Sequence, residues 1–223
     1  MGTILLNFNQ NPNIGLYAFV TDKFALVGRE VDANSIKEME RILKVPIHQI
    51  SIAGTSLIGV FLAGDENLVL VPSIVFDNEL KALEELKIPF QVFKTDLTCL
   101  GNNMYVGKHG ILMSSEFTSV EEKEIEKIFD RPVQIIDIAD SITPGACLVV
   151  NGDKGLIHRD ASSQEIKLVE KTLKIKIEAG TINMGVPHIK SGLINNSNGL
   201  IIGHGSGPAE IMNAEESLGY IEG

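Results

Sequence analysis

Hydrophobic and polar positions recur along the chain in blocks of about 44 residues. Each block opens with a glycine, followed by a strand-like apolar run and then a second one. A segment with apolar residues three or four positions apart comes next and predicts an amphipathic helix, and a third strand follows it. The glycines that mark the five blocks are Gly15, Gly59, Gly101, Gly145 and Gly192.

The predicted helices have recognisable ends. Three of them begin with Ser or Thr followed three residues later by Glu, a pattern that satisfies free amide donors at a helix start. The pairs are Ser35/Glu38, Thr118/Glu121 and Ser162/Glu165. A proline, which cannot continue a helical hydrogen-bond ladder, follows three helices at an equivalent place: Pro46, Pro89 and Pro132.

These units predict an α/β fold made of β-β-α-β repeats. The fifth unit lacks a third strand, and residues 3–8 supply a spare one at the start of the chain. Joining the two closes a five-unit pseudo-symmetric ring and leaves no exposed end unit. A linear α/β solenoid is the alternative. We therefore expect one domain over 1–223, with units at about 9–52, 53–94, 95–138, 139–179 and 180–223.

Composition narrows the class of protein. The chain has 223 residues, 44% hydrophobic and 22% charged, so it can bury a core. Its net charge of −10 argues against free nucleic acid as a partner. Two cysteines, Cys99 and Cys147, cannot form a disulfide framework and suit a reducing cytoplasm. We expect neither a signal peptide nor a membrane span.

Several motifs, in register in all five units, resemble the translation initiation factor 6 family. They are SIAG at 51–54, LVLVP at 68–72, LGN at 100–102, GLIH at 155–158 and AGTIN at 179–183. The resemblance implies the pentein fold, a ring of five units around a central channel with helices outside. Eukaryotic members carry a tail beyond the ring, and this sequence is similar to the shorter archaeal form.

The resemblance also implies a function in binding rather than in catalysis. The family attaches to the large ribosomal subunit and sterically prevents its association with the small subunit; eukaryotic members also serve in large-subunit maturation. The implied contact is chiefly an L14-family ribosomal protein, near an L24e-type protein and the sarcin–ricin loop. No cofactor is implied, and we expect a monomer.

An enzyme is the first alternative, because the pentein ring also hosts guanidine-modifying hydrolases and amidinotransferases. Those enzymes use a late Cys nucleophile with a His base. Here the last cysteine is Cys147, in the fourth unit, and the five histidines have no repeated partner. No HxxxH or CxxC spacing predicts a metal site. A ring scaffold for a non-ribosomal partner is the second alternative.

The candidate binding residues follow the repeat glycines, because equivalent strand ends of a ring crowd around one mouth of its channel. Adjacent amides at Asn102 and Asn103 suit an interface better than a core. The resemblance places Asn102 on the ribosome-facing surface and matches Val60 and Cys147 to interface positions. Core packing is the alternative for the apolar candidates. The other candidates are Leu16, Tyr17, Phe61, Ala146, Leu193 and Ile194, with Asn13, Thr55 and Asn183 weaker.

The acidic charge favours a particular part of the ribosome. An acidic ring is attracted to a basic ribosomal protein and repelled by bare rRNA. We therefore expect docking at a protein patch and an attraction that weakens with salt.

Overall fold

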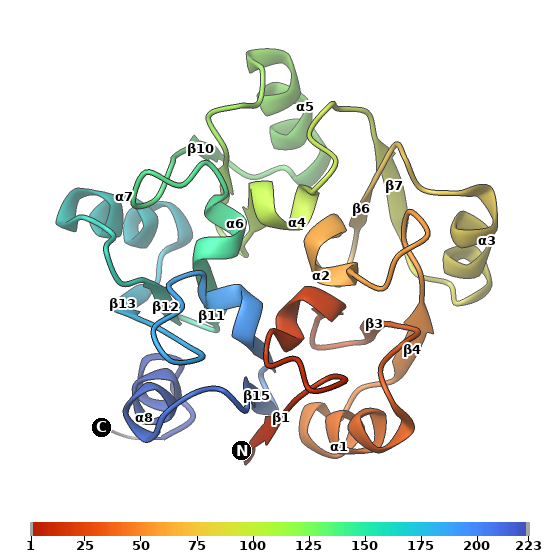
Figure 1. Ribbon diagram of the computed structural model, residues 1–223. Coiled ribbons are helices and arrows are strands. Elements are labelled where there is room, and N and C mark those ends of the chain that lie inside the picture. Colours follow the sequence, from red (N-terminus) through yellow and green to blue (C-terminus); the bar gives the residue numbers. More distant parts are fainter. Residues whose placement is uncertain (1, 222–223) are drawn as a thin grey trace.

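In every repeat, the middle strand of a three-stranded sheet pairs antiparallel with the strand before it. It pairs parallel with the strand that follows the helix in the first four units, and with the first strand of the chain in the fifth. The structure, a computed structural model, describes residues 2–221. Its five sheets form a ring with the longer helices outside (Figure 1). The channel at the centre of the ring is lined by residues from all five units. The α/β ring predicted from the repeats is confirmed.

The elements follow the same order in each unit. The first unit comprises η1 (Ile14–Tyr17), β2 (Ala18–Val20), β3 (Ala25–Gly28), α1 (Ala33–Leu43) and β4 (Ile47–Ile50). The second comprises α2 (Ile58–Phe61), β5 (Ala63–Gly64), β6 (Val69–Pro72), α3 (Asp77–Glu85) and β7 (Phe90–Phe93). The third comprises α4 (Leu100–Asn103), β8 (Met104–Val106), β9 (Ile111–Met113), α5 (Ser119–Phe129) and β10 (Val133–Ile135). The fourth comprises α6 (Pro144–Cys147), β11 (Leu148–Asn151), β12 (Lys154–His158), α7 (Ser163–Leu173) and β13 (Lys176–Gly180). The fifth comprises η2 (Ile189–Gly192), β14 (Leu193–Asn196), β15 (Gly199–Gly203), α8 (Pro208–Ser217) and, from the chain start, β1 (Gly2–Leu6).

The first strand of the chain closes the ring. β1 pairs parallel with β15, from Gly2 opposite Gly199 to Leu6 opposite Gly203. It fills the place that β4, β7, β10 and β13 fill in the other sheets. The linear solenoid is therefore wrong.

Two of the three predicted helix starts are confirmed. The hydroxyls of Thr118 and Ser162 accept hydrogen bonds from the amides of Glu121 and Glu165. The predicted start at Ser35 is wrong, because Asp32 caps α1. Its carboxylate accepts from the amides of Asn34 and Ser35, each at 3.0 Å. Asp is as good an N-cap as Ser, and its position three residues earlier lets α1 start sooner.

The core is shared between neighbouring units. One hydrophobic cluster joins Met39 and Leu43 of α1 to Ile14 of η1 and to Ile194 and Ile201 of the fifth unit. Because a unit buries its apolar face partly against its neighbour, closure of the ring completes the core.

Candidate functional site

Five single-turn helices surround one mouth of the channel. They are η1, α2, α4, α6 and η2, and they face the viewer in Figure 1. We call this end the turn-helix mouth. Strand ends were predicted at this mouth, but the first strand of each unit starts only after its turn helix. The hairpin loops between β2 and β3, β5 and β6, and their equivalents line the opposite end, the hairpin mouth.

Repeat glycines allow these short helices to stack on one another. A Cβ on Gly59 would lie 2.1 Å from the carbonyl oxygen of Gly15. A Cβ on Gly101 would lie 2.3 Å from the carbonyl oxygen of Gly59. Any side chain would therefore push the neighbouring helix away, which explains glycine at these positions.

The fifth unit breaks this rule. Its η2 begins at Ile189, as η1 begins at Ile14, so Lys190 and not Gly192 matches the repeat glycine. The predicted pair Leu193 and Ile194 was therefore two residues out of register, and both side chains are buried in β14.

Lys190 sends its side chain across the channel. Its Nζ donates to the carbonyl oxygens of Gly59 at 2.8 Å and Gly101 at 2.6 Å, so one ammonium connects the second, third and fifth units. Burial lowers the pKa of Lys190 to about 8, because the charged form loses water.

A small cavity lies at the turn-helix mouth. Its volume is about 260 Å³, and it brings together three predicted residues, Leu16, Asn102 and Ala146. All three are partly exposed. The remaining lining residues are Gly15, Gly59, Thr143, His188, Lys190 and Ser191.

Other candidates lie behind this surface. Asn103 and Cys147 point into the protein, with exposed fractions of 8% and 0%. Val60 and Phe61 are partly buried in α2. Tyr17 is also partly buried, and its hydroxyl accepts from the side chain of Asn11 at 3.1 Å.

Asn13 and Asn183 connect the first unit of the ring to the fifth. The Asn183 amide donates to the Asn13 side-chain oxygen at 3.3 Å and to the Pro12 carbonyl at 3.0 Å. The third weaker candidate, Thr55, is partly buried and its hydroxyl donates to the Ile52 carbonyl at 3.1 Å. All three therefore have contacts that explain them as supports of the loops around the mouth.

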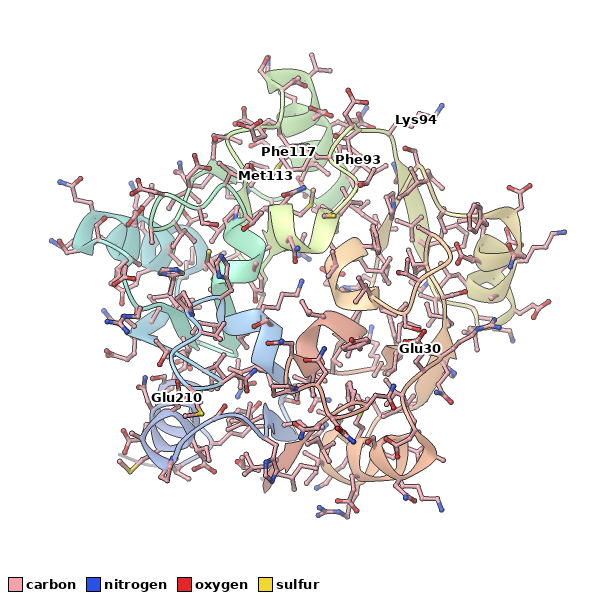
Figure 2. The ribbon with its side chains drawn as sticks, in the orientation of Figure 1. Glu30, Phe93, Lys94, Met113, Phe117 and Glu210 are labelled. Carbon is pink, nitrogen blue, oxygen red and sulfur yellow. The ribbon has the colours of Figure 1, made fainter. Side chains whose placement is uncertain are left out.

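Carboxylates fix three of these loops. Glu79 of α3 is 3% exposed and accepts from the amides of Ala53, Gly54 and Phe76 at 2.8, 2.9 and 3.0 Å. Glu165 binds Ala139 in the same way, and Glu210, labelled in Figure 2, binds Met184 and Gly185. Each carboxylate caps its own helix and also holds the loop before a turn helix.

Sequence reasoning missed the polar centre of the cavity, Thr143, His188, Lys190 and Ser191. A signal existed for Lys190. It follows Gly145 by 45 positions and comes after an apolar residue, like the other repeat glycines. Lys190 was not predicted, because the repeat was defined by its glycines alone.

The thiol and histidine groups do not form a nucleophilic pair. Burial raises the pKa of Cys147 to about 11, and its thiol donates to the Ile138 carbonyl at 4.0 Å. His158 and His188 contact each other edge to face, with ring centroids 5.6 Å apart. Within residues 2–221, no three His, Cys, Asp or Glu side chains gather as metal ligands. None of the helices described is both long enough and apolar enough to span a bilayer.

Loops around the turn-helix mouth carry more acidic than basic side chains. They follow the middle and last strands of the units. The acidic residues in them are Glu30, Asp32, Asp96, Glu116, Asp137, Asp140 and Asp160, and the basic residues are Arg29, Lys94 and Arg159; Glu30 and Lys94 are labelled in Figure 2.

Residues 3–217 match the eIF-6 family. The chain is similar to curated proteins named translation initiation factor 6. That of Thermococcus onnurineus is 34% identical, covering 97% of this chain and 98% of the relative. That of Pyrococcus abyssi is 33% identical with the same coverage. That of Sulfolobus acidocaldarius is 31% identical over 92% of this chain and 94% of the relative.

Two solved structures share the ring at low sequence identity. A dimethylarginine dimethylaminohydrolase aligns with a TM-score of 0.52 and 13% identity, covering 75% of this chain and 68% of that one. The N-terminal domain of a cyanobacterial arginine dihydrolase aligns with a TM-score of 0.50 and 13% identity, covering 74% and 69%. These similarities support the five-unit fold, and a shared fold does not imply a shared activity.

Proposed function

The chain belongs to the eIF-6 family, and from this premise we propose that it binds the large ribosomal subunit and prevents the small subunit from joining. The observation that carries the proposal is the match of nearly the whole chain to this family, with relatives named translation initiation factor 6. A second role in large-subunit maturation is part of the same proposal.

The proposed contact is the turn-helix mouth. Leu16, Asn102 and Ala146 surround its cavity, and Val60 lies on a neighbouring turn helix. Of the other candidates, Asn13, Tyr17 and Phe61 are partly exposed, whereas Asn103, Cys147 and Leu193 are buried.

Charge favours a protein patch as the target. The acidic loops around the mouth suit a basic ribosomal protein, for which an L14-family protein is our candidate, near an L24e-type protein and the sarcin–ricin loop. A polyanionic RNA surface alone would be repelled.

The mechanism is occlusion. The factor acts as a monomer in the cytoplasm, without a cofactor and without a chemical step, and its bulk covers the subunit-joining surface. The protonated state and buried position of Cys147 fit this non-catalytic function.

Sedimentation with purified archaeal subunits tests the proposal. We expect the protein to sediment with large subunits and not with small ones, and to reduce the yield of joined ribosomes at stoichiometric amounts. Sedimentation with neither subunit, or an undiminished yield of joined ribosomes, would contradict it.

A further inference from the structure

Among residues 2–221, no carboxylate pairs with the ammonium of Lys190. The ion pairs formed among residues 2–221 involve other side chains. Lys190 is partly buried. Withdrawing an ammonium from water costs free energy unless the charge is paired, and two carbonyl dipoles supply only part of the compensation. This charge lies at the centre of a protein whose net charge is −10.

The Lys190 ammonium has one N–H group beyond the two that the carbonyls accept. An ammonium has three N–H groups, and the carbonyls of Gly59 and Gly101 accept two hydrogen bonds from it. Lys190 lines the cavity at the turn-helix mouth. A group that enters this cavity therefore meets an ammonium with remaining capacity to bind an anion.

The rest of the cavity also suits an anion. Besides Lys190, its polar side chains are those of Asn102, Thr143, His188 and Ser191, and none of its lining residues is acidic. The Asn102 amide, the Thr143 hydroxyl and the His188 imidazole can each donate to an anion, whereas the Ser191 hydroxyl already donates to the His188 carbonyl at 2.8 Å. A volume of about 260 Å³ holds a carboxylate group with a few waters, since water occupies ~30 Å³ in the liquid.

The hairpin mouth is less suitable for an anion. Its cavity of about 660 Å³ also reaches Lys190, but Asp22, Asp65 and Glu66 line it. Arg131 on that side already pairs with Asp65 at 2.6 Å, and Lys108 is exposed to solvent. An anion that approached from the hairpin mouth would pass these three carboxylates.

We propose that the cavity at the turn-helix mouth accepts one carboxylate of the protein partner, which forms an ion pair with Lys190. The inference rests on the proposed function, because it specifies the group that a ribosomal protein inserts. A positive centre inside an acidic rim recognises a carboxylate surrounded by basic side chains. Successive RNA phosphates would meet the acidic rim, so a protein carboxylate fits better.

The first experiment tests the site without ribosomes. Acetate is titrated into the isotope-labelled protein, and NMR follows the Lys190 side chain and the Asn102 amide at constant ionic strength with chloride. We expect saturable shifts in the wild type and none in Lys190→Gln, which keeps a neutral donor for the two carbonyls. Absence of saturable shifts with acetate overturns the inference, as does saturation by inorganic phosphate alone.

The second experiment measures affinity for the large subunit. Lys190→Gln should bind about tenfold or more weakly, since it loses a charge-assisted hydrogen bond in a desolvated site. The matched control is Lys108→Gln, at the hairpin mouth, which should bind like the wild type.

Competition with acetate distinguishes an ion pair between Lys190 and a partner carboxylate from a purely structural role of Lys190 within the ring. Acetate should weaken subunit binding of the wild type more than chloride does at equal ionic strength, and it should leave the residual binding of Lys190→Gln unchanged. Equal binding by wild type and Lys190→Gln overturns the inference and leaves the proposed function standing. Failure of the wild type to bind any subunit contradicts the proposed function, while the acetate titration still decides the site.

Discussion

At the scale of single residues, one position of the repeat differs between units in a way that affects the whole ring. Four turn helices carry a glycine where the fifth carries Lys190, whose ammonium hydrogen-bonds across the channel. The same mouth presents Asn102 beside the cavity, while its neighbour Asn103 is buried. Two adjacent, chemically identical side chains therefore differ in environment, one at the cavity and one within the fold.

Lys190 makes the stability of the protein depend on pH. Its folded-state pKa of about 8 lies below the ordinary 10.5, so the unfolded chain holds more protons between these values. The free energy of unfolding should therefore rise as the pH increases from 8 to 10.5, by at most about 3 kcal/mol.

Denaturant unfolding of the wild type and of Lys190→Met isolates this effect, because the other titrating groups are common to both. The difference in stability between the two proteins should shift in favour of the wild type as the pH rises through 8. A difference that stays constant would show that Lys190 keeps its ordinary pKa.

Asn102→Arg should weaken large-subunit binding without lowering the melting temperature. The side chain is partly exposed at the cavity, so a larger cation obstructs the partner and disturbs little of the core. We expect a loss of about tenfold in affinity.

The matched control is Asn67→Arg, an exposed asparagine at the hairpin mouth. Equilibrium binding and thermal unfolding of both variants give the comparison. An unchanged binding curve for Asn102→Arg would remove this residue from the interface.

At the scale of elements, the same carboxylate side chains cap a helix and bind a neighbouring loop. Glu79 caps α3 and at the same time binds the loop before α2, where Ala53 and Gly54 have positive φ angles of 52° and 72°. The outer helices thereby help to set the shape of the mouth.

Glu79→Gln should destabilise the protein. A neutral amide has one acceptor oxygen, and its NH₂ group would face amide donors that the carboxylate now satisfies. Leaving buried donors unpaired costs about 1–3 kcal/mol, which a lower melting temperature would register. Glu85→Gln, at an exposed position on the same helix, is the control and should melt like the wild type.

Much of this element structure was predictable. The recurring markers located the middle strands, as at Ala25–Gly28, and the helices between them. The turn helices were not predictable, because a four-residue segment such as Leu100–Asn103 is too short to show helical periodicity. Of the candidate site, Leu16, Asn102 and Ala146 reach the cavity. Lys190 was missed because its importance comes from hydrogen bonds to units far away in the sequence.

At the scale of the whole molecule, closure depends on one short strand. β1 contributes five residues to the last sheet and covers the edge of β15. The fifth unit and the first also meet through η1 and η2, next to the mouth. The stability of the ring and the geometry of the turn-helix mouth are therefore linked.

Deletion of residues 1–6 should lower the melting temperature and cause concentration-dependent association. The deletion exposes the edge of β15, which carries Leu200, Ile201 and Ile202. Thermal unfolding and analytical ultracentrifugation measure the two effects. A Gly-Ser extension before Met1 leaves β1 in place and serves as the control; a deletion variant that stays monomeric and equally stable would contradict the prediction.

The pairing of β1 with β15 also determines when the ring can close during synthesis of the chain. The ribosome makes β1 first and β15 almost last, so the first strand must wait for nearly the whole chain before it finds its partner. Such a long sequence separation slows the final step of folding. A nascent chain therefore stays an open arc while it is tethered at the exit tunnel, and it gains its complete mouth only after the last unit has emerged.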